Sequence, residues 1–95
     1  MFRVKLTPAA AERFSSLHPD IRKQLKPALK ELYHTPCLGK GLHHELMGFR
    51  TLKVKRYRIV YKIDDIGRTV IVYAIGHRRD IYETLTELMR LKEDS

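Results

Sequence analysis

The sequence predicts an α+β fold: a hairpin of two helices packs on a small, twisted, mostly antiparallel sheet of four strands, and a C-terminal helix follows. Residues 2–6 and 52–63 alternate between apolar and polar side chains, which is the period of a strand with one buried face. Residues 8–33 and 80–92 place apolar side chains three or four positions apart, the spacing of amphipathic helices. The predicted order is β-α-α-β-β-β-α, an arrangement of helices layered on a sheet.

Two helices are expected after the first strand. Thr7 and Pro8 match an N-cap and a first helical position, so the first helix is expected over residues 8 to about 17. The second helix is expected from about residue 20 to residue 33. Pro27 lies inside it and removes a helical hydrogen bond at a cost of about 3 kcal/mol, so we expect a bend or break just before this proline.

The rest of the chain is predicted as a loop, three strands and a helix. Residues 36–48 contain three glycines and form the loop. Two strands within residues 52–63 are joined by a tight turn. Residues 69–75 form an unbroken apolar run, which is typical of a central strand buried on both faces. The last helix is expected from Asp80, a capping residue type, to about residue 92.

Length and composition indicate one small globular domain, residues 1–95. The chain is 43% hydrophobic, and none of its apolar runs approaches the ~20 residues that cross a bilayer. The N-terminal residues lack the apolar core of an export signal. The single cysteine, Cys37, cannot form an internal disulfide. We therefore expect a cytoplasmic protein with no membrane contact.

The charge is strongly positive and unevenly distributed. Nineteen Lys and Arg against eleven Asp and Glu give a net charge of +8. Residues 38–62 hold seven of these cations against one acid, whereas residues 80–95 hold five acids against two cations. A small domain this basic favours a polyanionic partner, with nucleic acid first and an acidic protein second.

Several kinds of chemistry are not supported by the sequence. His43 and His44 are adjacent and would point apart in an extended loop, so no metal site is predicted. Residues 39–41 lack the strand-and-helix context of a phosphate-binding loop. Cys37 has no evident general base beside it, so a catalytic thiol is not predicted. The Asp and Glu residues are at positions where turns and helix caps account for them, so no pair of catalytic carboxylates is predicted. We predict no metal and no cofactor.

Strand alternation gathers cations on one side of the predicted sheet. The apolar positions expected to face the helices are Leu52, Val54, Ile59 and Tyr61. Lys53, Lys55 and Arg58 then project from the opposite face or from the adjoining turn. Other cations and aromatic residues are expected around them: Arg50, Arg56, Tyr57, His77, Arg78, Arg79 and Tyr82. Cations that hold phosphates and rings that stack on bases suit single-stranded RNA or DNA, and the alternative is a basic face that meets only solvent.

This set of residue types is compatible with RNA cleavage without a metal. RNA carries its own nucleophile, the 2′-hydroxyl, so the protein must align it, remove its proton, stabilise the phosphorane and protonate the leaving oxygen. A lysine in a positive field has a lowered pKa and can act as the base, while arginine binds the phosphorane. Tyrosine or histidine can orient groups or transfer a proton.

Two motifs resemble the RelE/ParE superfamily of bacterial type II toxins. They are Tyr-Arg-x-x-Tyr at residues 57–61 and Gly-His-Arg-Arg-x-x-Tyr at residues 76–82. The resemblance extends over the whole chain, and the RelE branch is the nearer one. It implies a toxin that inhibits translation by cleaving mRNA, with the ribosome as partner, and that forms a hetero-oligomer with a cognate antitoxin. The antitoxin is expected to present an acidic, amphipathic segment that covers the cationic cleft.

The resemblance also implies roles for four residues. Arg58 matches a strand arginine expected to stabilise the scissile phosphate. Arg78 matches an arginine expected to bind phosphate or assist the leaving group. Tyr82 matches a tyrosine expected to stack on or orient the nucleotide, and Lys53 matches a strand lysine of the catalytic set.

Two alignments of the lysine pair and two roles of one histidine remain open. Lys53 and Lys55 match a pair of lysines, but the turn that follows is shorter here, and alignment on Val54 assigns Thr51 and Lys53 instead. Lys53 holds in both alignments. His77 stands where other members have lysine and is either a proton-transfer group or a histidine at a strand end. The further candidates for catalysis or RNA binding are Lys55, His77, Arg56, Arg79 and Arg50.

Three other functions compete with the ribonuclease. A ParE-like toxin would poison DNA gyrase without nuclease activity. A binding module would hold RNA or the ribosome without cleaving it, and a degenerate toxin would only bind the antitoxin. The acidic C-terminal helix either screens the basic cleft or contributes its apolar stripe to the core.

Overall fold

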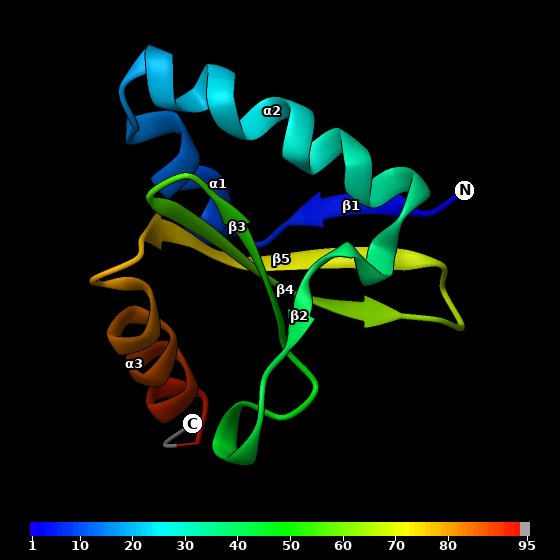
Figure 1. Cartoon of the computed structure of the whole chain (residues 1–95). Helices are drawn as coiled ribbons and strands as arrows, with labels where there is room; N and C mark the ends of the chain where they lie inside the picture. The colour runs from blue at the N-terminus through cyan, green and yellow to red at the C-terminus, as the bar shows by residue number, and fades with distance from the viewer. Residues whose placement is uncertain (94–95) are drawn as a thin grey trace.

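A computed structural model describes residues 1–93 of the chain, including every side chain in that range except those of Glu45, Leu88 and residues 91–93. The described residues form a sheet with helices on both of its faces (Figure 1). In chain order the elements are β1 (Arg3–Leu6), α1 (Pro8–Ser16), α2 (Pro19–His34), η1 (Pro36–Leu38), β2 (Lys40–Gly41), η2 (His44–Leu46), β3 (Arg50–Val54), β4 (Tyr57–Asp64), β5 (Thr69–His77) and α3 (Ile81–Glu93).

The sheet confirms the predicted α+β class and adds one strand to it. Its order is β1-β5-β4-β3-β2, with β1 parallel to β5 and the other neighbours antiparallel. The additional strand, β2, lies within the segment predicted as a loop and pairs Lys40 with Thr51 and Gly41 with Arg50. Two residues are too few to show an alternation, so this strand has no sequence signal.

Helices α1 and α2 cover one face of the sheet, and α3 covers part of the other (Figure 1). On the first face the four apolar positions predicted to meet the helices, residues 52, 54, 59 and 61, pack in one core with Leu25 and Leu32. On the second face, Ile81 and Leu85 of α3 pack with other sheet residues in a separate core. The apolar stripe of α3 therefore belongs to the core, and β5 is buried from both sides as predicted.

A β-bulge in β5 changes which face its residues meet. Tyr61 pairs with Val72 and Val60 with Ala74, so Tyr73 has no partner on β4. Because of this extra residue, Val72 and Ile75 lie in the core beneath α1 and α2, although they are three positions apart. The residues that follow the bulge are therefore shifted by one position relative to a regular strand.

The helix boundaries follow local capping. The Thr7 hydroxyl accepts a hydrogen bond of 3.2 Å from the Ala10 amide at the start of α1, as predicted. Helix α2 runs through Pro27 without interruption, so the expected break does not occur. Leu25 and Leu32 are fully buried on either side of this proline and hold the helix on the sheet. None of the described helices has the length and apolar character that crossing a membrane requires.

Candidate functional site

Lys53, Arg58 and Gly76 form a row across three strands, which we call the cation row. Lys53 is paired with Arg58 between β3 and β4, and Arg58 is paired with Gly76 between β4 and β5. Directly opposed residues project from the same face of a sheet, so the two cations lie side by side. Ile81, the first residue of α3, packs over Gly76, because a Cβ on this glycine would lie 3.4 Å from Ile81 Cδ1. The cation row therefore lies on the α3 face, beside the start of that helix.

An open cleft of about 610 Å³ lies next to the cation row. Residues 38–43 form one wall, residues 51–53 of β3 lie along it, and Tyr82 of α3 contributes its exposed ring. Lys53 and Tyr82, two of the four predicted catalytic residues, thus line the same cleft. Thr51 also lines it, and its hydroxyl oxygen is buried without a hydrogen-bond partner.

The guanidinium of Arg58 is held by the β3–β4 turn. Its Nη1 donates to the carbonyl oxygen of Lys55 at 3.0 Å and to that of Tyr57 at 2.8 Å. Among the described side chains, the one basic group within 4.0 Å of a carboxylate is the ring of His18, whose Nδ1 lies 3.6 Å from Asp20 Oδ2. The positive charges of Lys53 and Arg58 are therefore not neutralised by a carboxylate and remain available to an anionic ligand.

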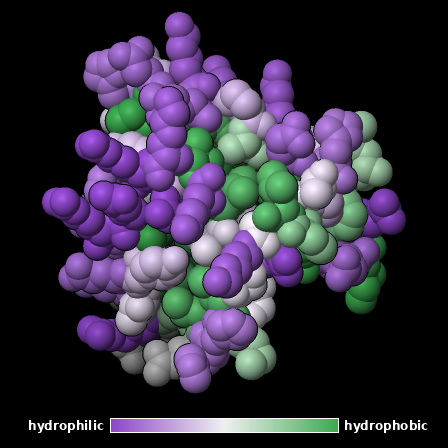
Figure 2. Space-filling view, viewed as in Figure 1, coloured by the Kyte–Doolittle hydropathy of each residue, from purple (hydrophilic) through white to green (hydrophobic). Residues whose placement is uncertain are grey.

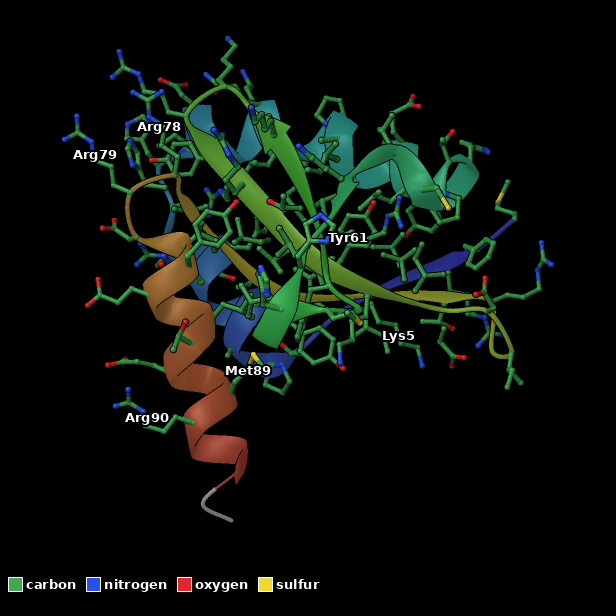
Figure 3. The ribbon with its side chains drawn as sticks, turned by 60° about the horizontal axis from the view of Figure 1, so that its bottom comes forward. Lys5, Tyr61, Arg78, Arg79, Met89 and Arg90 are labelled. Atoms are coloured by element: carbon green, nitrogen blue, oxygen red, sulfur yellow. The ribbon has the colours of Figure 1, made fainter. Side chains whose placement is uncertain are left out.

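Arg78 and Arg79 lie in the loop between β5 and α3. Their side chains are exposed and project outward where β5 leads into the helix (Figure 3). The Arg78 amide donates to the carbonyl oxygen of Arg56 at 2.8 Å, which fastens this loop to the β3–β4 turn. Hydrophilic side chains gather on this side of the molecule (Figure 2). Arg78 thus stands at the rim of the face that carries the cation row.

Lys55, Arg56 and His77 lie apart from the cleft. Together with Tyr57 they line a different pocket, on the α2 side of the same turn. The His77 ring meets the Tyr57 ring edge to face, with centroids 5.6 Å apart, and its Nδ1 accepts a hydrogen bond of 3.1 Å from the Arg79 amide. The bulge in β5 explains this position, because it shifts His77 onto the side that faces α2.

Arg50 is engaged in a structural network. Its guanidinium donates to the carbonyl oxygen of Gly39 at 3.1 Å and to that of Cys37 at 3.3 Å. The Tyr61 hydroxyl, fully buried, donates to the carbonyl oxygen of Pro36 at 2.6 Å and accepts from the Gly39 amide at 2.8 Å. Burial raises the pKa of Tyr61, an effect that the Gly39 amide and Arg50 partly oppose. This network fixes residues 36–39 and so positions one wall of the cleft.

Sequence reasoning did not find the wall formed by residues 38–43 or the buried hydroxyl of Thr51. The wall lies in a segment without periodicity, and its position depends on contacts made from another strand. The sequence pointed to Thr51 only through the alternative alignment, which assigns it to one position of the lysine pair. Its pairing with Val60, which lies in the core beneath α3, places it two residues before Lys53 on the same face.

Comparison with known proteins identifies relatives over almost the whole chain. The family described as "ParE toxin of type II toxin-antitoxin system, parDE" matches residues 4–82. Toxin RelG of Mycobacterium tuberculosis is 34% identical over 83 residues, covering 85% of this chain and 95% of that protein. The matched family region extends from β1 into the first turn of α3 and includes every candidate site residue.

Solved structures show the same fold. The toxin–antitoxin complex RelBE2 from Mycobacterium tuberculosis contains a similar chain, with a TM-score of 0.74 and 32% identity over 81% of this chain and 98% of that one. The isolated RelE toxin of E. coli superposes with a TM-score of 0.72 over 94% of this chain and 99% of that one, at 22% identity. The arrangement of sheet and helices is thus shared with both of these toxins.

Proposed function

The chain belongs to the RelE/ParE superfamily of toxins from type II toxin–antitoxin systems, and from this premise we propose that it is a metal-independent endoribonuclease that cleaves mRNA on the ribosome. The observation that carries the proposal is the cation row. Lys53 and Arg58 are cross-strand neighbours without carboxylate partners, and Lys53 shares the cleft with Tyr82. This arrangement suits a phosphate bound over the sheet with a base stacked against the tyrosine.

In the proposed reaction the 2′-hydroxyl of the RNA attacks the adjacent phosphorus. Lys53, as the free amine, takes the hydroxyl proton and so becomes the ammonium group that holds the phosphate. Arg58 binds the phosphorane oxygens, because its guanidinium is already oriented by two backbone carbonyls. The bond to the 5′-oxygen breaks, Arg78 at the rim stabilises the negative charge that develops on this oxygen, and a proton from water completes the 5′-hydroxyl. The products are a 2′,3′-cyclic phosphate and a 5′-hydroxyl.

The openness of the site supports action on the ribosome. The Tyr82 side chain is exposed, and the cleft is bounded by a single wall on the β2 side. The cation row contains neither a carboxylate nor a histidine, since His77 faces α2. A site with so few groups needs another molecule to hold the RNA in line for attack. The ribosome, which binds mRNA, is the proposed source of that positioning.

A cognate antitoxin is the partner that the solved relatives indicate, since several of them are toxin–antitoxin complexes. We propose that its inhibitory segment is acidic and amphipathic. Such a segment would neutralise Lys53 and Arg58 and cover the apolar side chains of the cleft wall, for example Leu38, which is 48% exposed.

A second candidate function is inhibition of DNA gyrase, because the matching family description names ParE. The two functions differ in their need for the cation row. If the protein is a gyrase inhibitor without nuclease chemistry, the wild type and an Arg58→Ala variant should block supercoiling by gyrase equally well.

The test is primer extension on mRNA translated in a purified system. Wild-type protein is expected to cut within codons, while Lys53→Ala and Arg58→Ala are expected to cut at least about 100-fold more slowly. Lys30→Ala, on the exposed side of α2, is the matched control that removes one cation elsewhere. Equal cleavage by all four proteins would reject the site, and no cleavage with blocked supercoiling would favour the gyrase function.

A further inference from the structure

A second cationic pocket lies on the opposite side of the β3–β4 turn from the cleft. We call it the tip pocket. Its volume is about 370 Å³, and it is lined by Ile21, Gln24, Lys55, Arg56, Tyr57 and His77. Its lining includes two exposed cations, two aromatic rings in edge-to-face contact and no carboxylate. Cations combined with aromatic rings are the groups that bind the backbone and bases of single-stranded nucleic acid.

The sequence of the turn is unusual for its geometry. Two-residue hairpin turns favour Asn, Asp or Gly, because at least one central residue has a positive φ. Here the central residues are Lys55 and Arg56, and Lys55 has a φ of 56°. A turn that carries two cations in place of these residue types is compatible with a binding role for the cations.

We propose that the tip pocket is a second binding site for the phosphate backbone of single-stranded RNA, separate from the cleft and contacting the same strand beyond the cleaved bond. This inference rests on the proposed function. Arg58 donates to the Lys55 carbonyl oxygen at 3.0 Å, and the Arg78 amide donates to the Arg56 carbonyl oxygen at 2.8 Å. The turn is therefore the shared edge of both cationic surfaces, and an RNA strand leaving the cation row passes directly over it.

The surroundings favour RNA over an acidic protein as the occupant. A protein interface has an apolar centre, and none of the large exposed apolar side chains of the described residues lines this pocket. Ile21 and Tyr57 are only partly exposed. The exposed residues of the lining are Gln24, Lys55 and Arg56, and the two cations among them match a phosphate chain.

The experiment uses a variant that removes both charges without straining the turn. In Lys55→Asn/Arg56→Gln, asparagine tolerates the left-handed conformation better than lysine does. The control Arg3→Gln/Lys30→Gln loses the same charge from β1 and the exposed side of α2. Affinity for a short single-stranded RNA with 2′-O-methyl sugars, which cannot supply the nucleophile, is measured by fluorescence anisotropy from about 50 to about 200 mM salt.

Each phosphate contact contributes about 0.7 to the slope of log affinity against log salt for a single strand. The double variant is expected to reduce the slope by about 1.4, Arg56→Gln alone by about 0.7, and the control variant not at all. An unchanged slope in the double variant, or a wild type that does not bind the probe, would overturn the proposal. So would an unchanged RNA affinity together with weaker binding of the antitoxin.

The binding readout separates this inference from the nuclease proposal. The probe cannot be cleaved, so its binding does not depend on nuclease activity. If the wild type does not cleave mRNA but the double variant has a reduced salt slope, the tip pocket stands and the nuclease proposal is rejected. If the wild type cleaves mRNA and the slope of the double variant is unchanged, the nuclease proposal stands and the tip pocket is rejected.

Discussion

The hydroxyl of Tyr61 accepts a 2.8 Å hydrogen bond from the amide of Gly39, so a residue buried beneath α1 and α2 holds a wall of the cleft on the opposite side of the sheet. The same hydroxyl donates to Pro36, and Arg50 reinforces the link by donating to Gly39. The geometry of the cleft thus depends on a contact that includes none of the proposed catalytic residues.

Tyr61→Phe should destabilise the protein by about 2 kcal/mol, because it leaves a buried amide and a carbonyl without their partner. Urea unfolding measures this change, and RNA cleavage should fall as well because the wall is released. Tyr33→Phe, at a partly exposed tyrosine, is the matched control and should change neither quantity. Wild-type stability in Tyr61→Phe would contradict the structural role of the network.

Gly39→Ala should be poorly tolerated. An added Cβ would lie 2.7 Å from the Tyr61 hydroxyl oxygen and 2.8 Å from the Thr51 carbonyl oxygen, and the second of these belongs to the backbone and cannot rotate away. We expect a loss of about 1–3 kcal/mol in the free energy of unfolding. Gly41→Ala adds the same methyl group where nothing lies within 4 Å, so thermal unfolding of the two variants should differ clearly.

Stability should fall at high pH in a way that depends on Tyr61. Burial raises the pKa of this tyrosine in the folded state, so its contribution to stability is complete below the unfolded value of about 10 and is lost as pH rises through the higher folded value. The difference in unfolding free energy between wild type and Tyr61→Phe should therefore shrink above pH ~10. A constant difference across that range would show that the folded-state pKa is not raised.

Thr51→Val should stabilise the protein by about 1 kcal/mol, because the variant replaces a buried hydroxyl that has no partner with a methyl group of similar size. Thr69→Val is a suitable comparison, since its hydroxyl donates to the Gly67 carbonyl oxygen at 2.9 Å and its loss should not stabilise. Chemical denaturation measures both. A destabilised Thr51→Val would indicate a partner for this hydroxyl.

Arg58→Lys should reduce RNA cleavage by about 100-fold although the charge is kept. The planar guanidinium of arginine can bind the Lys55 and Tyr57 carbonyl oxygens and a phosphate at the same time, whereas the single ammonium group of lysine cannot. Arg68→Lys, in the turn before β5, makes the same exchange where the arginine stacks on Phe2 and should leave cleavage unchanged. Full activity in Arg58→Lys would reduce the role of this residue to its charge.

The sequence predicted the α+β class and the adjacency of Lys53 and Arg58, because alternation in β3 and β4 distinguishes the two faces. It could not predict the position of His77. Residues 69–75 are apolar on both faces, so they carry no alternation that would reveal a one-residue bulge. The bulge is set by pairing with β4, which is a property of the assembled sheet.

The strand that joins β1 to the rest of the sheet, β5, is synthesised after every other strand of the described sheet. β1, at residues 3–6, finds its only sheet neighbour among the described strands in β5, at residues 69–72, and the third member of the cation row also comes from β5. A nascent chain that stops before β5 has no complete sheet and no complete row. Prematurely terminated products should therefore be harmless to the cell that makes them, whatever the supply of antitoxin.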